Sequence, residues 1–273
     1  MTNTQEPGRS FRSFIGLKRD QASDYILYAI SIIGFIAIWW IGSIILNKPY
    51  LPAPPLVLDA FIKSFNKDPA TGLPMMQQVF ASLGRFVVGF LLALLVAVPL
   101  GLAMGYSRIA DGLGKPIAEM LRPIPPIAWV PLFFIALGLY WGPVAVIFLG
   151  AFFPILSNVI FGVKSVETTL MDAAKTLGAN RRTIFTKVVF PYTIPYLMTG
   201  VTVGLGIAWM CIVAAEMIGA RGGGIGAIIN INGSIGLYEY MFAGMLMIAI
   251  LGIATTGASK LIEKRVSIWM GMR

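Results

Sequence analysis

The sequence predicts an all-α, polytopic membrane protein with six transmembrane helices. Hydrophobic residues make up 57% of the 273 residues and charged residues only 12%. The mean hydropathy of +0.81 is too high for a soluble globular protein. Several windows approach the roughly 20 apolar residues that a helix needs to cross a bilayer. Helices are the expected spanning form because lipid offers no partner to an unpaired backbone group.

Six apolar segments are interpreted as spans. The first is too long for the apolar part of a signal peptide, so we expect it to stay as an uncleaved anchor. The third is short and rich in proline, and the turn at 140–143 predicts that the third and fourth spans form a helical hairpin. The predicted spans are 25–46, 80–106, 125–139, 143–163, 194–217 and 238–261.

Small residues inside the spans predict where helices approach one another closely. Gly101 and Gly105 form one pair at a spacing of four, and Gly200 and Gly204 form another. Such pairs let backbones pack where lipid supplies no hydrophobic drive for association. The single cysteine, Cys211, lies inside the fifth span, where we expect a buried, inert thiol.

The basic residues predict the orientation. Most of the 21 Lys and Arg residues fall in the two terminal segments and in the loops 107–124 and 164–193. Six spans put all of these on one side, and the positive-inside rule makes that side cytoplasmic. The net charge of +9 then suits the anionic inner leaflet, so no nucleic-acid partner is expected. The predicted parts are a cytoplasmic tail (1–24), the first span with an outer proline segment (25–78), a membrane core (79–262) and a second cytoplasmic tail (263–273).

Three connecting segments carry their own predictions. Residues 9–20 fit either a short helix in the inner membrane interface or a disordered tail. Residues 47–65 predict a proline segment followed by a short amphipathic helix, which lies on the outer membrane surface, receives a docking protein or packs as a cap. The glycine-rich loop 219–236 has no nucleotide-fold context, so we expect a tight, irregular re-entry near the outer mouth.

Several kinds of chemistry are excluded by residue usage. The chain has no histidine and only one cysteine, which argues against histidine-based metal sites, thiolate clusters and Ser–His catalysis. It contains no Gly-x4-Gly-Lys-Ser/Thr motif, so the chain has no phosphate-binding loop with which to bind ATP on its own. We therefore expect no catalytic residue, no metal site and no bound cofactor in this chain.

Two charged residues lie inside or at the edge of predicted spans. The second span runs inward past Arg85 and the fifth runs outward to Glu216, so both residues are expected near the outer face. A charge in the membrane is costly unless it is paired or hydrated. One hypothesis is an ion pair that helps to gate a pathway; the alternative is that each side chain reaches the interface separately.

The loop after the fourth span contains a polar insert, MDAAKTLGANRRTIFTKVVFP (171–191). Thr168 and Thr169 are predicted to cap a short helix from about 170, with an acidic residue in its first turn. A small apolar face follows, then a glycine that ends the helix, and a second helix over 181–189 that is basic on one side. Pro191 is predicted to stop this second helix before the fifth span. A short polar helix with a flat alanine face is typical of a docking site for another protein.

This insert resembles the coupling loop of ABC importer permeases, written Glu-Ala-Ala, three residues, Gly, nine residues, Ile-x-Leu-Pro. The sequence has Asp-Ala-Ala at 172–174, Gly178, and Val-Val-Phe-Pro at 188–191, with the spacing intact. Further segments are similar to the nitrate/sulfonate/taurine/bicarbonate permease group. They are ASLGRFVVGF (81–90), LRPIPPIAWVPL (121–132), GAFFPILSNVIFGV (150–163) and GLGIAWMCIVAAEMIG (204–219).

The resemblance implies a type I ABC importer permease fold, with 79–262 as the core permease domain and 164–193 as the coupling loop. It further implies a prokaryotic plasma (inner) membrane location and three protein partners: a second permease copy in a homodimer, a cytoplasmic ABC ATPase dimer that binds ATP and Mg, and an extracytoplasmic substrate-binding protein. The residues that it assigns to ATPase coupling are Asp172, Ala173, Ala174, Leu177, Gly178, Arg181, Arg182 and Pro191.

Polar and aromatic residues of the spans are the candidates for the translocation pathway. They are Trp129, Asn158, Thr202, Trp209, Glu216 and Arg85. Asn158 fits either the cavity lining or a cross-link between helices. The prolines at the start of the third span predict a broken helix whose freed backbone groups line a cavity.

The leading functional hypothesis is a permease subunit for a small anion, with an aliphatic sulfonate such as taurine as the preferred substrate. Nitrate, bicarbonate or a pyrimidine precursor would share the mechanism. The hypothesis from another class is a stand-alone secondary transporter or channel, in which the polar loop is only a tether. The two classes differ in whether uptake needs a separate ATPase.

Overall fold

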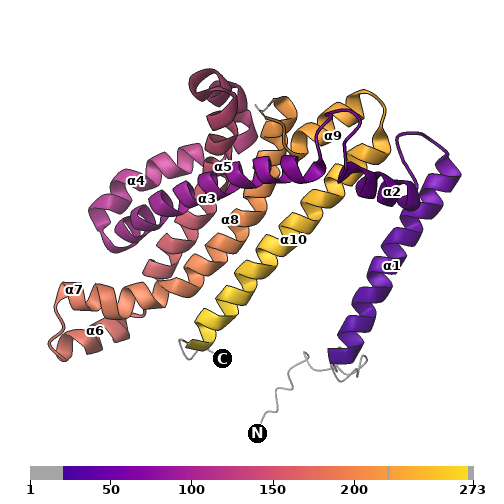
Figure 1. Ribbon diagram of the computed structural model, residues 1–273. Coiled ribbons are helices and arrows are strands. Elements are labelled where there is room, and N and C mark those ends of the chain that lie inside the picture. The colour runs from indigo at the N-terminus through magenta and orange to yellow at the C-terminus, as the bar shows by residue number, and fades with distance from the viewer. Residues whose placement is uncertain (1–20, 220–221, 270–273) are drawn as a thin grey trace, which may run out of the picture. The chain divides into compact units, whose positions relative to one another are not determined.

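The computed structural model describes residues 21–219 and 222–269, and the tail at 9–20 lies outside this part. The described residues form helices and no strand, as the sequence predicts. The elements are α1 (Gln21–Leu46), α2 (Pro54–Ser64), α3 (Met75–Tyr106), α4 (Arg108–Leu121), η1 (Pro126–Trp129), α5 (Val130–Lys164), α6 (Thr168–Thr176), α7 (Arg181–Ile184), η2 (Phe185–Val189), α8 (Phe190–Ile218), α9 (Ile225–Ser234) and α10 (Tyr238–Trp269) (Figure 1).

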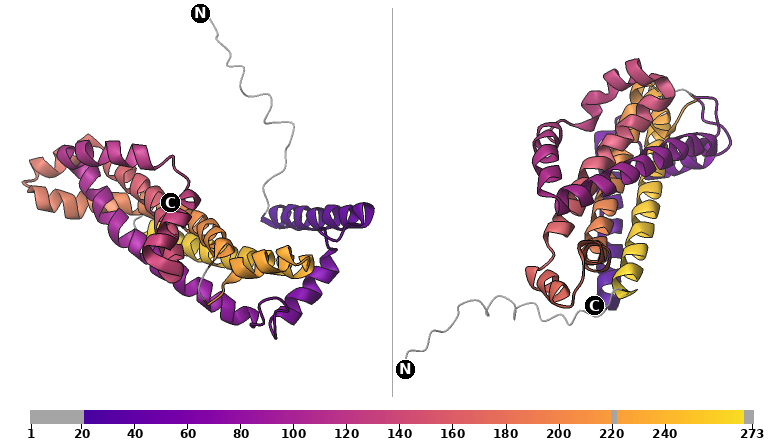
Figure 2. Two further views of the ribbon diagram at one scale, coloured as in Figure 1. Left: turned by 90° about the horizontal axis from the view of Figure 1, so that it is seen from above. Right: turned by 90° about the vertical axis from the view of Figure 1, so that its left-hand side faces the viewer.

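The chain divides into two compact units, Met1–Leu56 and Val57–Arg273. The first unit contains α1, a 26-residue helix of the length and composition of a membrane span. The second unit contains the other long helices. Its α6 and α7 lie at one end and α9 at the opposite end, as two further views show (Figure 2).

The core of the second unit is formed by α3, α5 and α8, which pack along their lengths. Glycines permit this packing. A Cβ atom added to Gly101 would lie 2.8 Å from the side chain of Val159, and one on Gly105 would lie 2.5 Å from Val163. At Gly200 a Cβ would lie 2.9 Å from Asn158. The predicted close approach at these glycines is confirmed, and Cys211 is buried as expected.

Within the described residues, five helices are long and apolar enough to span a membrane, where the sequence predicts six spans. The predicted third and fourth spans are two limbs of one interrupted helix, Pro126–Lys164. The first limb, 126–137, is about 18 Å long at 1.5 Å per residue, which is short of the roughly 30 Å apolar thickness of a bilayer.

The break between the two limbs lies at Gly138, two residues before the predicted turn at 140–143. Gly138 has φ 77° and ψ 179°, a conformation that costs glycine little because it has no Cβ. The limbs then pack on each other: a Cβ on Gly142 would lie 3.4 Å from the carbonyl oxygen of Phe133. The helical hairpin is therefore present, with its turn displaced toward the N-terminus.

The helix that follows the polar insert does not stop at Pro191, which corrects the prediction. Helical backbone runs from Arg181 through α7, η2 and α8 to Ile218. Proline lacks the N–H that an α-helix needs at this position. The π-helical turn η2 precedes it, in which the amide of Phe190 bonds to the carbonyl of Phe185, five residues earlier. This wider turn carries the helix past the proline without a break.

Candidate functional site

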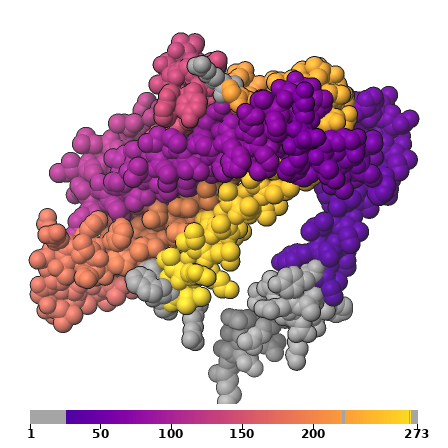
Figure 3. Space-filling view, in the orientation of Figure 1, coloured from indigo at the N-terminus to yellow at the C-terminus, as the bar shows by residue number. Residues whose placement is uncertain are grey.

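The polar insert forms a compact helical corner at one end of the second unit, where α6 and α7 project beyond the long helices (Figure 3). Gly178 joins the two short helices with φ +82°, in the left-handed region that favours glycine. Asn180 begins α7, because its side-chain oxygen accepts a hydrogen bond of 2.8 Å from the amide of Thr183. The start of α6 differs from the prediction. The helix begins at Thr168 after Glu167, and no side chain caps it.

The two faces of α6 have different environments. Met171 and Ala174 pack inward against a buried apolar cluster. That cluster consists of Val163, Val166, Ile184 and Val189. Leu170 and Leu177 instead face outward, with 45% and 88% of their surface exposed, and Ala173 is exposed beside them. The predicted apolar face contains Ala173, Ala174 and Leu177. The inclusion of Ala174 is wrong, because this residue packs against the cluster. The apolar face available to a partner is Leu170, Ala173 and Leu177.

The charged residues of the insert are exposed and bonded only locally. Asp172 pairs with Lys175 at 2.8 Å, and both side chains are more than 60% exposed. Arg181 and Arg182 are exposed at the start of α7. Exposed pairs of this kind contribute little to stability, so these charges are free to serve recognition.

The opposite end of the unit contains a buried ion pair. The Nη1 atom of Arg85 on α3 lies 2.6 Å from Oε1 of Glu216 on α8, and their side chains are 2% and 0% exposed. The predicted pairing is confirmed, and separate contact with the membrane interface is excluded by this burial. A gating role for the pair stays a prediction.

The ion pair is the centre of a larger polar network. Ser82, one turn before Arg85, lies 2.8 Å and 2.9 Å from the two Glu216 oxygens and accepts a hydrogen bond of 2.9 Å from the amide of Ile225. The amide of Gly226 donates to Glu216 at 3.1 Å. The carboxylate therefore lies at the N-terminus of α9, where the helix dipole favours negative charge.

Arg85 and the glycine loop complete this arrangement. Arg85 Nη1 also donates to the carbonyl oxygen of Gly223 at 2.8 Å. Gly224 has φ +150°, and a Cβ on it would overlap the Glu216 carboxylate. The predicted irregular turn is thus observed at Gly222–Gly224, all with positive φ, and its glycines let the backbone approach the buried carboxylate.

A second branch of the network was not predicted from the sequence. Gln78 donates to the Thr71 hydroxyl at 2.8 Å, and Thr71 donates to Asp68 at 2.8 Å. Asp68 also accepts a hydrogen bond of 3.0 Å from Asn232 on α9. One signal was available: Gln78, Ser82 and Arg85 recur at a helical spacing in an otherwise apolar segment and therefore share one face of α3.

The remaining pathway candidates are not brought together with this pair. Trp209 donates to the Thr255 hydroxyl at 2.9 Å, and the Thr202 and Ser259 hydroxyls lie 2.9 Å apart. Both contacts link α8 to α10. Asn158 donates to the Pro154 carbonyl on its own helix at 2.8 Å.

Of these candidates, Asn158 also lies in a groove and Trp129 lies in an aromatic stack. Asn158 lines a groove of about 290 Å³ that also includes Arg122. Trp129 stacks on Phe133, with ring centroids 6.1 Å apart, in the first limb of the hairpin.

One continuous helix joins the two sites. Glu216 follows Arg181 by 35 residues of unbroken helical backbone, which corresponds to about 50 Å at 1.5 Å per residue. α7 and the buried carboxylate therefore lie at the two ends of one helix.

Comparison with known proteins identifies related chains. Residues 89–268 match the family described as "Binding-protein-dependent transport system inner membrane component". An ABC transporter permease protein of Methanocaldococcus jannaschii is 42% identical over 239 residues, covering 87% of this chain and 89% of the relative. The taurine transport system permease protein TauC of Escherichia coli is 32% identical, with 86% of each chain covered.

Two further comparisons add a second transport system and the fold. The nitrate import permease protein NrtB of Synechococcus elongatus is 30% identical, with 82% of each chain covered. Inward-facing structures of the MetNI methionine ABC transporter include a chain that is similar in fold. Its TM-score is 0.62 at 22% identity, covering 70% of this chain and 95% of that chain. The protein described here therefore belongs to the binding-protein-dependent inner-membrane permeases of ABC transporters and has the type I importer permease fold.

Proposed function

We propose that this chain forms the translocation pathway of an ATP-driven importer and is driven by a separate ATPase through the 170–191 segment. The observation that supports this most strongly is the exposed apolar face of α6, Leu170, Ala173 and Leu177. A short helix that presents apolar anchors at i, i+3 and i+7 suits insertion into a groove of another protein. Exposed apolar side chains surrounded by charges mark an interaction site.

The mechanism follows from the continuous helix 181–218. Closure of an ATPase dimer around ATP and Mg would displace α6 and α7 together, because Ala174 and Ile184 pack in one cluster. The displacement passes to α8 as a rigid-body step. At the other end, Glu216 and its bonds to α3 and α9 hold the helices that must separate or rotate when access alternates. The chain thus shifts a conformational equilibrium and forms no covalent intermediate.

The proposed orientation puts α6, α7 and both termini in the cytoplasm and the Arg85–Glu216 network toward the outside. Its support is the positive-inside distribution of Lys and Arg. Under this orientation an extracytoplasmic binding protein would deliver substrate near the glycine loop. A second copy of this chain would complete the pathway, with the groove at Asn158 as one wall of it.

The proposed substrate is a small anion, with taurine or another aliphatic sulfonate preferred. The relatives named for taurine and nitrate import support a substrate of this class. Nitrate, bicarbonate and a pyrimidine precursor are the alternatives. The binding protein is expected to carry most of the selectivity.

Reconstitution tests the proposal. Proteoliposomes containing the chain, the ATPase and the binding protein should take up labelled taurine only when ATP is present on the side of the membrane where the ATPase is bound. The same vesicles without the ATPase should show background uptake. Uptake by the chain alone, without ATP, would instead assign it to the secondary transporters.

A further inference from the structure

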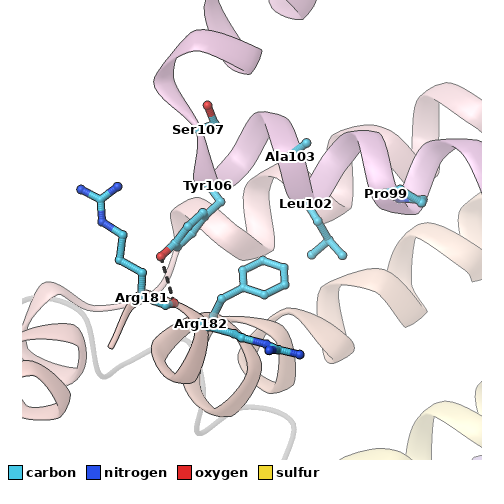
Figure 4. A pocket seen from close by; sticks show the side chains of 8 residues that line it. Pro99, Leu102, Ala103, Tyr106, Ser107, Arg181 and Arg182 are labelled. Carbon is cyan, nitrogen blue, oxygen red and sulfur yellow. Dashed lines mark hydrogen bonds between the residues drawn. The ribbon is translucent and has the colours of Figure 1, made fainter. Parts of the chain in front are cut away.

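A groove of about 550 Å³ lies between the C-terminal end of α3 and the residues of α7 and the start of η2 (Figure 4). Its lining residues are Pro99, Leu102, Ala103, Tyr106, Ser107, Arg181, Arg182 and Phe185. The floor is apolar, and the two arginines lie at one end. None of the contacts described for the coupling face of α6 uses this groove.

The apolar part of the groove follows one face of a membrane span. Pro99, Leu102 and Tyr106 recur at helical spacing on α3, and Ala103 is exposed between them. From Tyr106 to Pro99 the face extends about 10 Å along the helix. The groove therefore begins where the apolar span ends and continues into the apolar layer, where a lipid chain can lie and a water-soluble protein cannot.

The polar end of the groove carries positive charge. Figure 4 shows Arg181 extending beside Tyr106, whereas Arg182 extends to the opposite side. Tyr106 donates a long hydrogen bond of 3.4 Å to the Arg181 carbonyl and stacks edge-on with Phe185 at 5.2 Å. These contacts hold the two walls together while both guanidinium groups stay exposed.

Two acidic residues of the neighbouring segments form ion pairs with lysines rather than with these arginines. Asp111 pairs with Lys164 at 2.6 Å, and Asp172 pairs with Lys175 at 2.8 Å. Among the described residues, neither Arg181 nor Arg182 forms an ion pair with a carboxylate. Both guanidinium groups are therefore available to an external anion, and guanidinium matches a phosphate in geometry.

We propose that this groove binds an anionic phospholipid. One acyl chain lies along Pro99, Leu102 and Ala103, and the phosphate lies against the exposed guanidinium group of Arg181 beside Tyr106, while Arg182 adds positive charge on the opposite side. Basic pockets between transmembrane helices are suited to such headgroups. The assignment to the inner leaflet rests on the orientation in the proposed function. Binding itself does not, because the groove is complete in this chain without an ATPase.

The location suggests a consequence for coupling. The lipid would contact α3 through its acyl chain and the base of α7 through its headgroup, beside the π-helical turn η2. It would therefore bias the angle at which the coupling segment meets the membrane helices. The competing occupant of the arginines is the ATPase, which is an outcome of the test below.

Native mass spectrometry of the purified full chain tests the proposal with phosphatidylglycerol and phosphatidylcholine of identical acyl chains. Wild type should retain phosphatidylglycerol at least about tenfold better, given the contribution of two cations to anionic-lipid binding. Arg181→Gln/Arg182→Gln should abolish this preference. Ala103→Phe, which fills the groove and keeps both arginines, should reduce retention of both lipids. Lys264→Gln/Arg265→Gln removes the same charge from exposed positions on α10 and should behave as wild type.

Three results would overturn the proposal. The first is equal retention of the two lipids by wild type. The second is unchanged phosphatidylglycerol retention in Ala103→Phe, which would mean surface attraction without a groove. The third is a double-glutamine variant that retains lipid but no longer binds the ATPase, which would assign the arginines to that interface. The first two results are measured without the ATPase, so they do not depend on whether the chain drives import; the third adds the ATPase to the same double variant.

Discussion

The two ends of the second unit use charge in opposite ways. At the Arg85–Glu216 end, the polar groups are buried and bond to residues more than 130 positions away in the sequence. At the coupling end, the side chains are exposed and their hydrogen bonds span three or four residues. One end joins three helices through buried bonds, and the other exposes a surface whose bonds are local.

The difference shows that distance alone does not measure the role of an ion pair. Arg85–Glu216 and Lys63–Asp59 both have an N···O distance of 2.6 Å, but the first pair is buried and the second is about 60% exposed. A buried charge that loses its partner remains uncompensated, whereas an exposed charge is simply hydrated. The four predictions that follow test this contrast.

The largest effect is expected for Arg85→Gln or Glu216→Gln. Each leaves a buried charge without its partner and should lower the free energy of unfolding by about 3–5 kcal/mol. Unfolding of the purified chain by SDS in mixed micelles measures this. The double variant should recover part of the loss, so a double-mutant cycle with no coupling energy would contradict the role given to the pair.

The next largest effect is expected for Ser82→Ala. This change removes the hydroxyl that donates to Glu216 and accepts from Ile225, and leaves buried groups unsatisfied at a cost of about 1–3 kcal/mol. Hydrogen exchange at the N-terminus of α9 should accelerate with it. Ser165→Ala, at a hydroxyl that donates to the carbonyl of Phe161 four residues earlier, is the control and should leave that exchange unchanged.

A smaller effect is expected for Gly178→Ala. A Cβ there meets nothing within 4 Å, so the change isolates the backbone cost of a positive φ, about 1–2 kcal/mol. Local protease sensitivity between α6 and α7 should rise. Gly34→Ala, in the helix α1 with open space around it, lacks this backbone conformation and should not destabilise the chain. Equal losses of stability in the two variants would contradict the backbone strain assigned to a side chain at position 178.

The smallest effect is expected for Lys63→Gln, which breaks the exposed pair with Asp59. The free energy of unfolding should change by about 0–1 kcal/mol under the same SDS titration. A loss as large as that of Arg85→Gln would remove the distinction between the buried and the exposed pair.

The sequence predicted much of this fold because spans and the coupling loop depend on local composition and spacing. The sequence also predicted an ion pair between Arg85 and Glu216. The directions of the two spans put both residues at one depth, and a charge buried in the membrane needs a partner. The position of the kink was predicted wrongly. The local sequence allows a helix break at Gly138 as well as at 140–143, and the packing of the two limbs decides between these positions.

Two errors at the coupling end have a tertiary cause. Pro191 alone predicts a helix stop, but a π-helical turn precedes it and the helical backbone continues to Ile218. Ala173 and Ala174 are indistinguishable by composition, and only the apolar cluster beneath α6 turns Ala174 inward. The hydrogen bond that Asn232 donates to Asp68 joins segments 164 residues apart, which no local pattern reveals.

The central claim is that the outward face of α6 transmits the work of an ATPase. Leu177→Asp tests it most directly, since Leu177 is 88% exposed and its substitution should leave the unfolding free energy unchanged. In proteoliposomes with the ATPase and the binding protein, we predict that ATP-driven taurine uptake falls at least tenfold. Undiminished uptake in a correctly assembled Leu177→Asp complex would contradict the account.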